Sequence, residues 1–180
     1  MFGMTNTQAN GIQKMTSETR DPALVKTPRA YQADYFGWLE DQLVLLKTGR
    51  LDEVDAEHVA EEIRDIASRE FDKLEEALTA LTFHILKWDL LPDRRSGSTV
   101  LSIDAHRDQI DATLRRNPSL MNDVGEALVN SYTVATYDVM RDSGLAESIF
   151  AAQSPYDFET LRRRVFRFDN FVSPSGSEYT

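Results

Sequence analysis

The feature that most constrains the fold is a long helical pattern over residues 55–89. Apolar side chains recur there at intervals of three and four, and neither proline nor glycine interrupts the pattern. This spacing is typical of an amphipathic α-helix with one apolar face. Asp55 is a suitable N-cap, and Pro92 and Gly97 mark the turn that follows. The apolar positions are Val59, Ile63, Ile66, Leu74, Ala77, Leu81, Ile85 and Trp88.

Four other segments carry a helical pattern, and no segment alternates convincingly as a strand would. They cover residues 31–46, 98–116 and 120–142, and a short fifth helix that begins at Ser154 and Pro155. Short connections between long helices imply antiparallel neighbours. The sequence therefore predicts an all-α fold, an antiparallel up-and-down four-helix bundle with a short extra C-terminal helix.

The first and the fifth helix are predicted from side chains that share one face. In residues 31–46 these are Tyr35, Leu39, Leu43 and Leu46, and Gly49 is placed to end the helix in a left-handed conformation. In the fifth helix they are Phe158, Leu161, Val165 and Phe168. Ser154 would cap that helix, with Pro155 at its first position.

The length of 180 residues fits a single domain. Residues 1–29 are rich in Thr, Asn, Gln and Ser without a sustained helical period, so we expect a mobile N-terminal tail. Residues 170–180 are expected to form a mobile C-terminal tail. The helical bundle domain is expected to cover residues 30–169.

Composition excludes several classes of function. The chain has no Cys, which excludes disulfides, a thiol nucleophile and a zinc site that needs thiolates. The formal net charge of −10 argues against coating of nucleic acid over the whole surface. No stretch is apolar enough for a membrane helix, and the N-terminus has no apolar run typical of a secretory signal. We therefore expect a cytoplasmic protein without membrane contact.

Motifs for common reactions are missing. The sequence contains no P-loop, no G-x-G-x-x-G, no G-x-S-x-G and no H-E-x-x-H. His58 and His84 lie 26 residues apart on one expected helix, which separates them by roughly 39 Å. They cannot share a metal unless the helix breaks, so we expect no metal and no cofactor. No catalytic residue is assigned, and His84 is the one candidate.

Polar residues inside the apolar stripes are the best candidates for a site. Glu70 lies between Ile66 and Leu74, and Arg107 lies between Ile103 and Ile110. Burial of a charge is costly unless the charge is paired. Each residue therefore belongs either to a structural ion pair, to a helix edge near solvent, or to a functional cleft.

Antiparallel packing about a turn near Arg95 brings His84 and His106 to a similar height. A neutral imidazole can act as a general base, although a hydrogen-bonded core histidine is the more ordinary role. We expect the turn cations and Arg107 to gather beside His84. The candidate binding residues are Glu70, His84, Lys87, Arg94, Arg95 and Arg107.

Charge is distributed unevenly along the chain. Residues 52–76 hold eleven Asp and Glu against three Lys and Arg, which indicates a solvated face or a surface for a basic partner. A cluster of arginines occupies residues 162–167. We expect this cluster to dock against the acidic half of the long helix; phosphate binding is the alternative.

Several of these elements, in this order, resemble the N-terminal and central parts of the sequences in a bacterial family, domain of unknown function family 29. This family is abundant in cyanobacteria. The matching stretches are Tyr31 to Gln42, Gly49 to Asp52, His58 to Ile63, Glu70, Leu74, His84 to Trp88, Pro92 to Ser96, Ile103, Arg107, Ile110 and Asn117 to Leu120. The family usually has a Trp soon after the Arg-Arg-Ser turn, where this chain has Thr99. The resemblance covers residues 31–160 and implies an all-helical bundle without an established activity.

Two functions compete. The first is a non-catalytic protein-interaction module, which binds a protein partner or a second copy through helix faces; charge reversal at Glu61 and Glu62 should then weaken the complex. The alternative is a protein that binds or cleaves nucleic acid, in which His84 acts as general acid or base and Lys87 and Arg107 stabilise phosphate charge. A small anionic ligand held by Arg107 and His84 is a third possibility.

Overall fold

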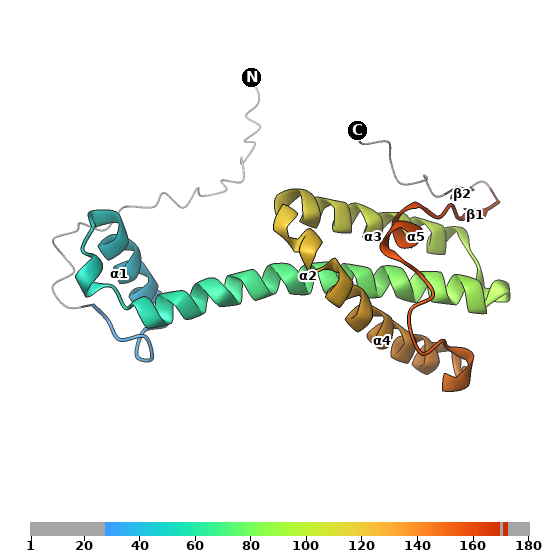
Figure 1. Ribbon diagram of the computed structural model, residues 1–180, viewed down its shortest axis with the longest axis horizontal. Helices are drawn as coiled ribbons and strands as arrows, with labels where there is room; N and C mark the ends of the chain where they lie inside the picture. The colour runs from blue at the N-terminus through green and yellow to red at the C-terminus, as the bar shows by residue number, and fades with distance from the viewer. Residues whose placement is uncertain (1–27, 170, 173–180) are drawn as a thin grey trace, which may run out of the picture. The chain divides into compact units, whose positions relative to one another are not determined.

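The structure is a computed structural model that describes residues 28–169 together with 171 and 172 (Figure 1). Its elements are α1 (Tyr35–Thr48), α2 (Ala56–Leu90), α3 (Gly97–Arg116), α4 (Val124–Ser143), α5 (Phe158–Arg163), β1 (Arg167–Phe168) and β2 (Phe171–Val172). Short 3₁₀ turns connect the helices at Leu51–Glu53, Pro92–Arg94, Pro118–Asn122 and Glu147–Ile149. The predicted all-α fold class is confirmed, since β1 and β2 are only a two-residue antiparallel pair.

The chain divides into two compact units, with the boundary after Glu62 inside α2. Helix α1 and the start of α2 belong to the first unit, and the rest of α2 with α3, α4 and α5 belongs to the second. The predicted tails fall mostly on residues 1–27, 170 and 173–180, which lie outside the described residues. Arg29, which the prediction assigned to the N-terminal tail, donates from its backbone N and its Nε to Asp41, each over 2.9 Å.

Helix α1 ends at Gly49 as its sequence predicts, but it begins at Tyr35 rather than at residue 31. Asp34 is the N-cap, and its Oδ1 accepts a hydrogen bond from the backbone N–H of Gly37 over 2.9 Å. Gly49 ends the helix with φ of 73°, a left-handed conformation that glycine adopts without steric cost. Asp55 caps the next helix, α2, by accepting from the backbone N–H of His58.

The face that α1 buries differs from the one its apolar pattern predicts. The four side chains expected on one face are exposed, including Leu43 at 52 % and Leu46 at 46 %. The opposite face is buried and includes Trp38, Asp41 and Gln42. Polar partners explain this choice, because Asp55 accepts from the Trp38 indole N–H over 3.2 Å and donates its own backbone N–H to Gln42 over 2.8 Å.

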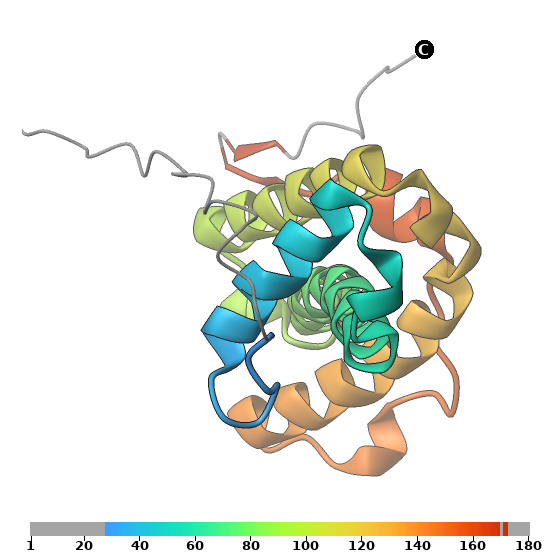
Figure 2. The same cartoon turned by 90° about the vertical axis from the view of Figure 1, so that its left-hand side faces the viewer.

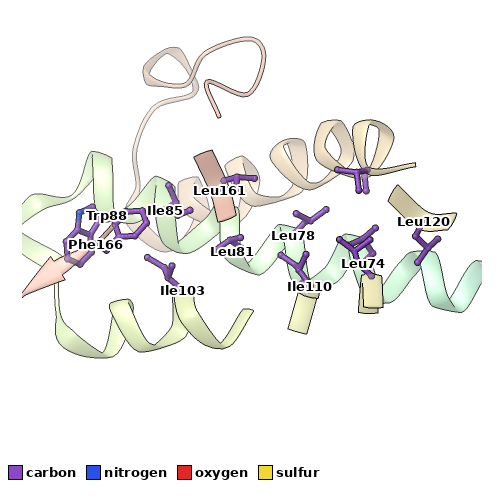
Figure 3. Packing of buried hydrophobic residues seen from close by; sticks show 14 of the residues in the cluster. Leu74, Leu78, Leu81, Ile85, Trp88, Ile103, Ile110, Leu120, Leu161 and Phe166 are labelled. Carbon is purple, nitrogen blue, oxygen red and sulfur yellow. The ribbon is translucent and has the colours of Figure 1, made fainter. Parts of the chain in front are cut away.

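In the second unit, α3 and α4 lie on opposite sides of α2, as the two views in Figures 1 and 2 show. The core begins at Leu74, so the earlier stripe positions Ile63 and Ile66 remain exposed. Fully burying one leucine or isoleucine contributes roughly 1.5–3 kcal/mol. Figure 3 shows core side chains from several elements, among them Leu74, Leu78, Leu81, Ile85, Trp88, Ile103, Ile110, Leu120, Leu161 and Phe166.

The fifth helix is shorter than predicted and begins later. Its N-cap is Asp157, whose carboxylate accepts from the backbone N–H of Thr160 over 2.7 Å. Ser154, the predicted cap, forms a local turn with Tyr156 instead. The helix ends at Arg163, so Val165 lies beyond it and Phe168 lies in β1.

Candidate functional site

Four of the six predicted site residues gather around one cavity of about 300 Å³, here called the α2–α3 cavity. It lies between the end of α2 and the start of α3. The predicted residues on its wall are His84, Lys87, Arg94 and Arg95. The other lining residues are Trp88, Ser96, Ser98, Thr99 and Ser102. Thr99 is the position where the resembled family usually carries a Trp.

Two cations of the cavity share one carboxylate on α4. The Lys87 Nζ lies 2.7 Å from Asp142 Oδ2. Arg94 Nη1 lies 3.6 Å from the same oxygen and donates to the backbone carbonyl of Asp142 over 3.4 Å. The hydrogen bond from Lys87 is the main reason why the pKa of Asp142 lies below its ordinary value.

Arg95 is held differently. Its Nε donates to the backbone carbonyl of Trp88 over 2.8 Å, and its guanidinium lies 5.2 Å above the Trp88 ring. Stacking of a guanidinium on an indole is favourable and restricts the side chain. No carboxylate in the described part of the chain forms an ion pair with Arg95.

The two histidines meet as the hairpin argument predicts. The rings of His84 and His106 stack with centroids 5.6 Å apart and 20° between their planes. Burial, followed by the charges of His106 and Lys87, lowers the pKa of His84 to about 4. His84 is therefore neutral at neutral pH and is a weak base there. The Nδ1 atom of His106 is buried and has no hydrogen-bond partner among the described residues.

Glu70 does not line the α2–α3 cavity. Its carboxylate lies 2.6 Å from Lys73 Nζ and accepts from the Asn117 amide over 2.8 Å. These contacts, the Lys73 hydrogen bond first, lower the pKa of Glu70. Glu70 therefore ties α2 to the residue that ends α3, which corresponds to the structural interpretation of this position.

Arg107 also lies away from the α2–α3 cavity and is buried. It donates from Nε to the carbonyl of Leu161 over 2.8 Å and from Nη2 to the carbonyl of Arg164 over 2.7 Å. Its guanidinium also lies 5.4 Å from the centre of the Phe166 ring. Carbonyls at a helix end lack intrahelical partners, so Arg107 satisfies the end of α5 and anchors the C-terminal segment.

Three of the four arginines in residues 162–167 pair internally, but the prediction of their partner was wrong; the fourth, Arg167, is exposed. Arg162 bonds Asp111 of α3 at 2.6 Å and 3.0 Å, and Arg164 bonds both carboxylate oxygens of Asp89 near the end of α2. The third arginine, Arg163, pairs with Glu159 on its own helix. None of these acids belongs to residues 52–76, because α5 returns along the other half of α2.

A second concavity is a groove of about 690 Å³ between α2 and α4, here called the α2–α4 groove. Its acidic residues are Glu75, Glu76, Asp138 and Asp142. Its remaining lining residues are Thr79, Ala80, Phe83, Val134 and Arg141. This groove was not predicted from the sequence, and the one signal for it was that Glu75 and Glu76 end the acidic run.

A second feature that was not predicted from the sequence lies in the first unit. The hydroxyls of Tyr31 and Tyr35 both donate to the carboxylate of Glu62, and the Tyr31 bond measures 2.7 Å. This hydrogen bond is the main reason why the pKa of Tyr31 is raised to about 12. The Tyr31 ring also stacks on His58, whose Nδ1 lies 2.7 Å from Asp55. Glu62 therefore accepts hydrogen bonds from two tyrosines, Tyr31 and Tyr35, that precede it in the chain.

Two further features are absent from residues 28–169 and 171–172, a metal-binding cluster and a membrane-spanning helix. No group of three or more His, Asp or Glu side chains there is placed to hold a metal ion. No helix in that part of the chain is long and apolar enough to cross a bilayer.

Comparison with known proteins places the chain in a family. Comparisons of the chain with curated proteins and with solved structures found no match. The model of one family, described as domain of unknown function DUF29, matches residues 30–166. That match spans most of the chain and both units, and it agrees with the resemblance seen in the sequence. The protein therefore belongs to the DUF29 family.

Proposed function

We propose that this protein is a non-catalytic protein-interaction module that binds a cationic amphipathic helix of a partner protein in the α2–α4 groove. The observation that carries the proposal is the groove itself, which combines an apolar floor with a surplus of carboxylates. Helix-in-groove binding requires both features when the incoming helix has Lys or Arg beside its apolar face.

The floor of the groove suits the apolar side of a helix. Phe83 is partly buried, and Val134 is 46 % exposed on the facing helix. Thr79 and Ala80 also line the groove, and their small side chains let another backbone approach closely. An apolar anchor seated between Phe83 and Val134 would supply most of the binding free energy, because buried anchors dominate such interfaces.

The charges around the floor suit Lys or Arg on the incoming helix. Asp138 pairs with Arg141 over 2.7 Å, and Asp142 pairs with Lys87. Glu75 accepts a hydrogen bond from the Asn130 amide, and no Lys or Arg of the described residues pairs with Glu75 or Glu76. Complementary rim charges chiefly raise the association rate and make it sensitive to salt.

Titration of the full-length protein with two synthetic helical peptides tests this proposal. One peptide of about 18 residues carries leucines on one face and lysines on the other, and the second has glutamates in place of the lysines. Fluorescence anisotropy should show saturable binding of the lysine peptide and none of the glutamate peptide. Binding of both peptides, or of neither, contradicts the proposal.

Three variants locate the binding surface. Glu76→Lys and Val134→Asp change the rim and the floor of the groove, and each should weaken binding at least about 10-fold, which corresponds to about 1.4 kcal/mol. Glu61→Lys makes the same charge change at an exposed position outside the groove, on the acidic part of α2 that the sequence alone suggested as the partner surface. An equal loss in Glu61→Lys and Glu76→Lys would indicate attraction by net charge and would refute docking in the groove.

A further inference from the structure

We propose that the α2–α3 cavity is a binding site for a phosphomonoester dianion. This site is distinct from the α2–α4 groove, although Asp142 lines that groove and pairs with Lys87 and Arg94 of the cavity. It rests on the chemical character of the cavity wall, on the restraint of Arg95 and on the volume enclosed.

The wall of the cavity has a composition opposite to that of the whole chain. The protein has 30 Asp and Glu against 20 Lys and Arg. The nine residues that line the cavity include three cations, four hydroxyl side chains and no carboxylate. A concave surface that collects cations and hydrogen-bond donors in an acidic protein favours an anion.

Arg95 provides a guanidinium that is already oriented. Its Nε is used by the Trp88 carbonyl, and its plane lies against the Trp88 ring. No hydrogen bond or ion pair within the described residues uses its two terminal nitrogens. A restrained guanidinium loses little entropy when it binds, and its paired N–H groups match two oxygens of a phosphate.

The other two cations set the charge of the ligand. Lys87 and Arg94 share one carboxylate, that of Asp142. Three cations and one carboxylate leave two positive charges at the cavity, and a phosphomonoester carries close to two negative charges at neutral pH. His84 adds no charge at that pH because its pKa is low, so it serves as a neutral hydrogen-bonding group beside the ligand.

Hydroxyl groups and volume complete the match. Ser96 Oγ lies 2.8 Å from Ser98 Oγ and 2.9 Å from Thr99 Oγ1, so these hydroxyls can turn from each other toward an acceptor. They stand where α3 begins, and a helix start favours an anion. A cavity of about 300 Å³ is at the small end of ligand sites, which suits a compact monoester better than a polynucleotide strand.

Isothermal titration calorimetry of the full-length protein tests the site with inorganic phosphate and with thymidine 5′-monophosphate. Saturable binding of at least one probe is expected, and thymidine without phosphate should not bind. Tighter binding of the nucleotide identifies a nucleotide monoester as the source, whereas equal affinities identify the phosphate group alone. Absence of saturable binding of either probe up to about 10 mM overturns the proposal, since that limit corresponds to less than about 3 kcal/mol.

Two variants and a control assign the binding to the cavity. Arg95→Gln removes the oriented guanidinium, and Ser98→Asp places a carboxylate at an exposed position on the wall, so the second variant is informative even where the first unfolds. Each should weaken phosphate binding at least about 10-fold, and the exposed Arg116→Gln should leave it unchanged. Equal binding by all three, or tighter binding of an RNA that lacks a terminal phosphate, overturns the proposal. Peptide binding in the α2–α4 groove should persist in Arg95→Gln, so the two proposals can fail separately.

Discussion

Replacement of Arg107 by methionine should destabilise the second unit strongly. Arg107 is buried, donates to the carbonyls of Leu161 and Arg164, and lies against Phe166. Methionine fills a similar space and cannot donate. A hydrogen bond that involves a charged donor contributes about 1.5–3 kcal/mol, and two buried carbonyls would lose their donor.

The expected loss is about 3–5 kcal/mol in the free energy of unfolding. This is less than the sum of two such bonds plus the desolvation of both carbonyls, because removal of the guanidinium also relieves the cost of its burial. Burial is indeed the main reason why the pKa of Arg107 is lowered. Urea unfolding followed by circular dichroism at 222 nm measures the loss.

Arg163→Met is the matched control. Arg163 is 67 % exposed and pairs with Glu159 four residues earlier, so its replacement should cost at most about 0.5 kcal/mol. A loss below about 1 kcal/mol in Arg107→Met would refute the anchoring role. Loss of phosphate binding with unchanged stability would instead return Arg107 to the functional site.

Three further predictions concern other parts of the chain. The free energy of unfolding should fall by an amount on the order of 1 kcal/mol as pH drops from 6.5 to about 4, because the pKa of His84 is lower in the folded state than in the unfolded state. His84→Gln should remove this part of the pH dependence of urea unfolding, and an unchanged profile in that variant would contradict the prediction. Leu45→Ala should cost about 2–5 kcal/mol because Leu45 is fully buried, and Leu43→Ala should stay within about 0.5 kcal/mol because it is half exposed; similar losses in thermal unfolding would disprove the assigned face of α1. Glu62 raises the pKa of Tyr31 to about 12, and burial with Asp89 raises that of Tyr156. In absorbance at 295 nm, Glu62→Gln should move the Tyr31 step from near pH 12 toward pH 10 and leave the late ionisation of Tyr156 in place; an unchanged titration curve would contradict this.

The ends of most helices could be predicted because local chemistry sets them. Asp55 caps α2, and Gly49 and Gly144 end α1 and α4 in left-handed conformations. Three helix starts were predicted less well: α1 begins at Tyr35 rather than at residue 31, and α4 begins at Val124 rather than at residue 120. In the fifth helix, Ser154 and Asp157 both offer a capping oxygen. The choice between them depends on how the segment returns to the core.

The buried face of α1 could not be predicted from periodicity. Its leucine stripe has the regular spacing of a core face, but a regular spacing does not say which neighbour is present. Trp38 and Gln42 are buried because Asp55 is placed to bond both of them. That contact joins residues well separated in sequence and follows from tertiary structure.

The cluster around His84 was predictable because a helical hairpin fixes which residues of its two helices lie at the same level along the helix axes. His84, Lys87, Arg94 and Arg95 all lie close to one turn. The direction of the Arg107 side chain was not predictable, because its partners come from a segment more than fifty residues later. The α2–α4 groove was missed for the same reason, since it depends on how two distant helices cross.

Binding of a cationic helix in the α2–α4 groove is decided by a comparison of three proteins. The affinity of the lysine peptide is measured by fluorescence anisotropy for the wild type, Glu76→Lys and Glu61→Lys. We expect a loss of at least about 10-fold in Glu76→Lys and little change in Glu61→Lys. Unchanged affinity in Glu76→Lys, with a loss in Glu61→Lys, would place the partner on the start of α2 and refute docking in the groove.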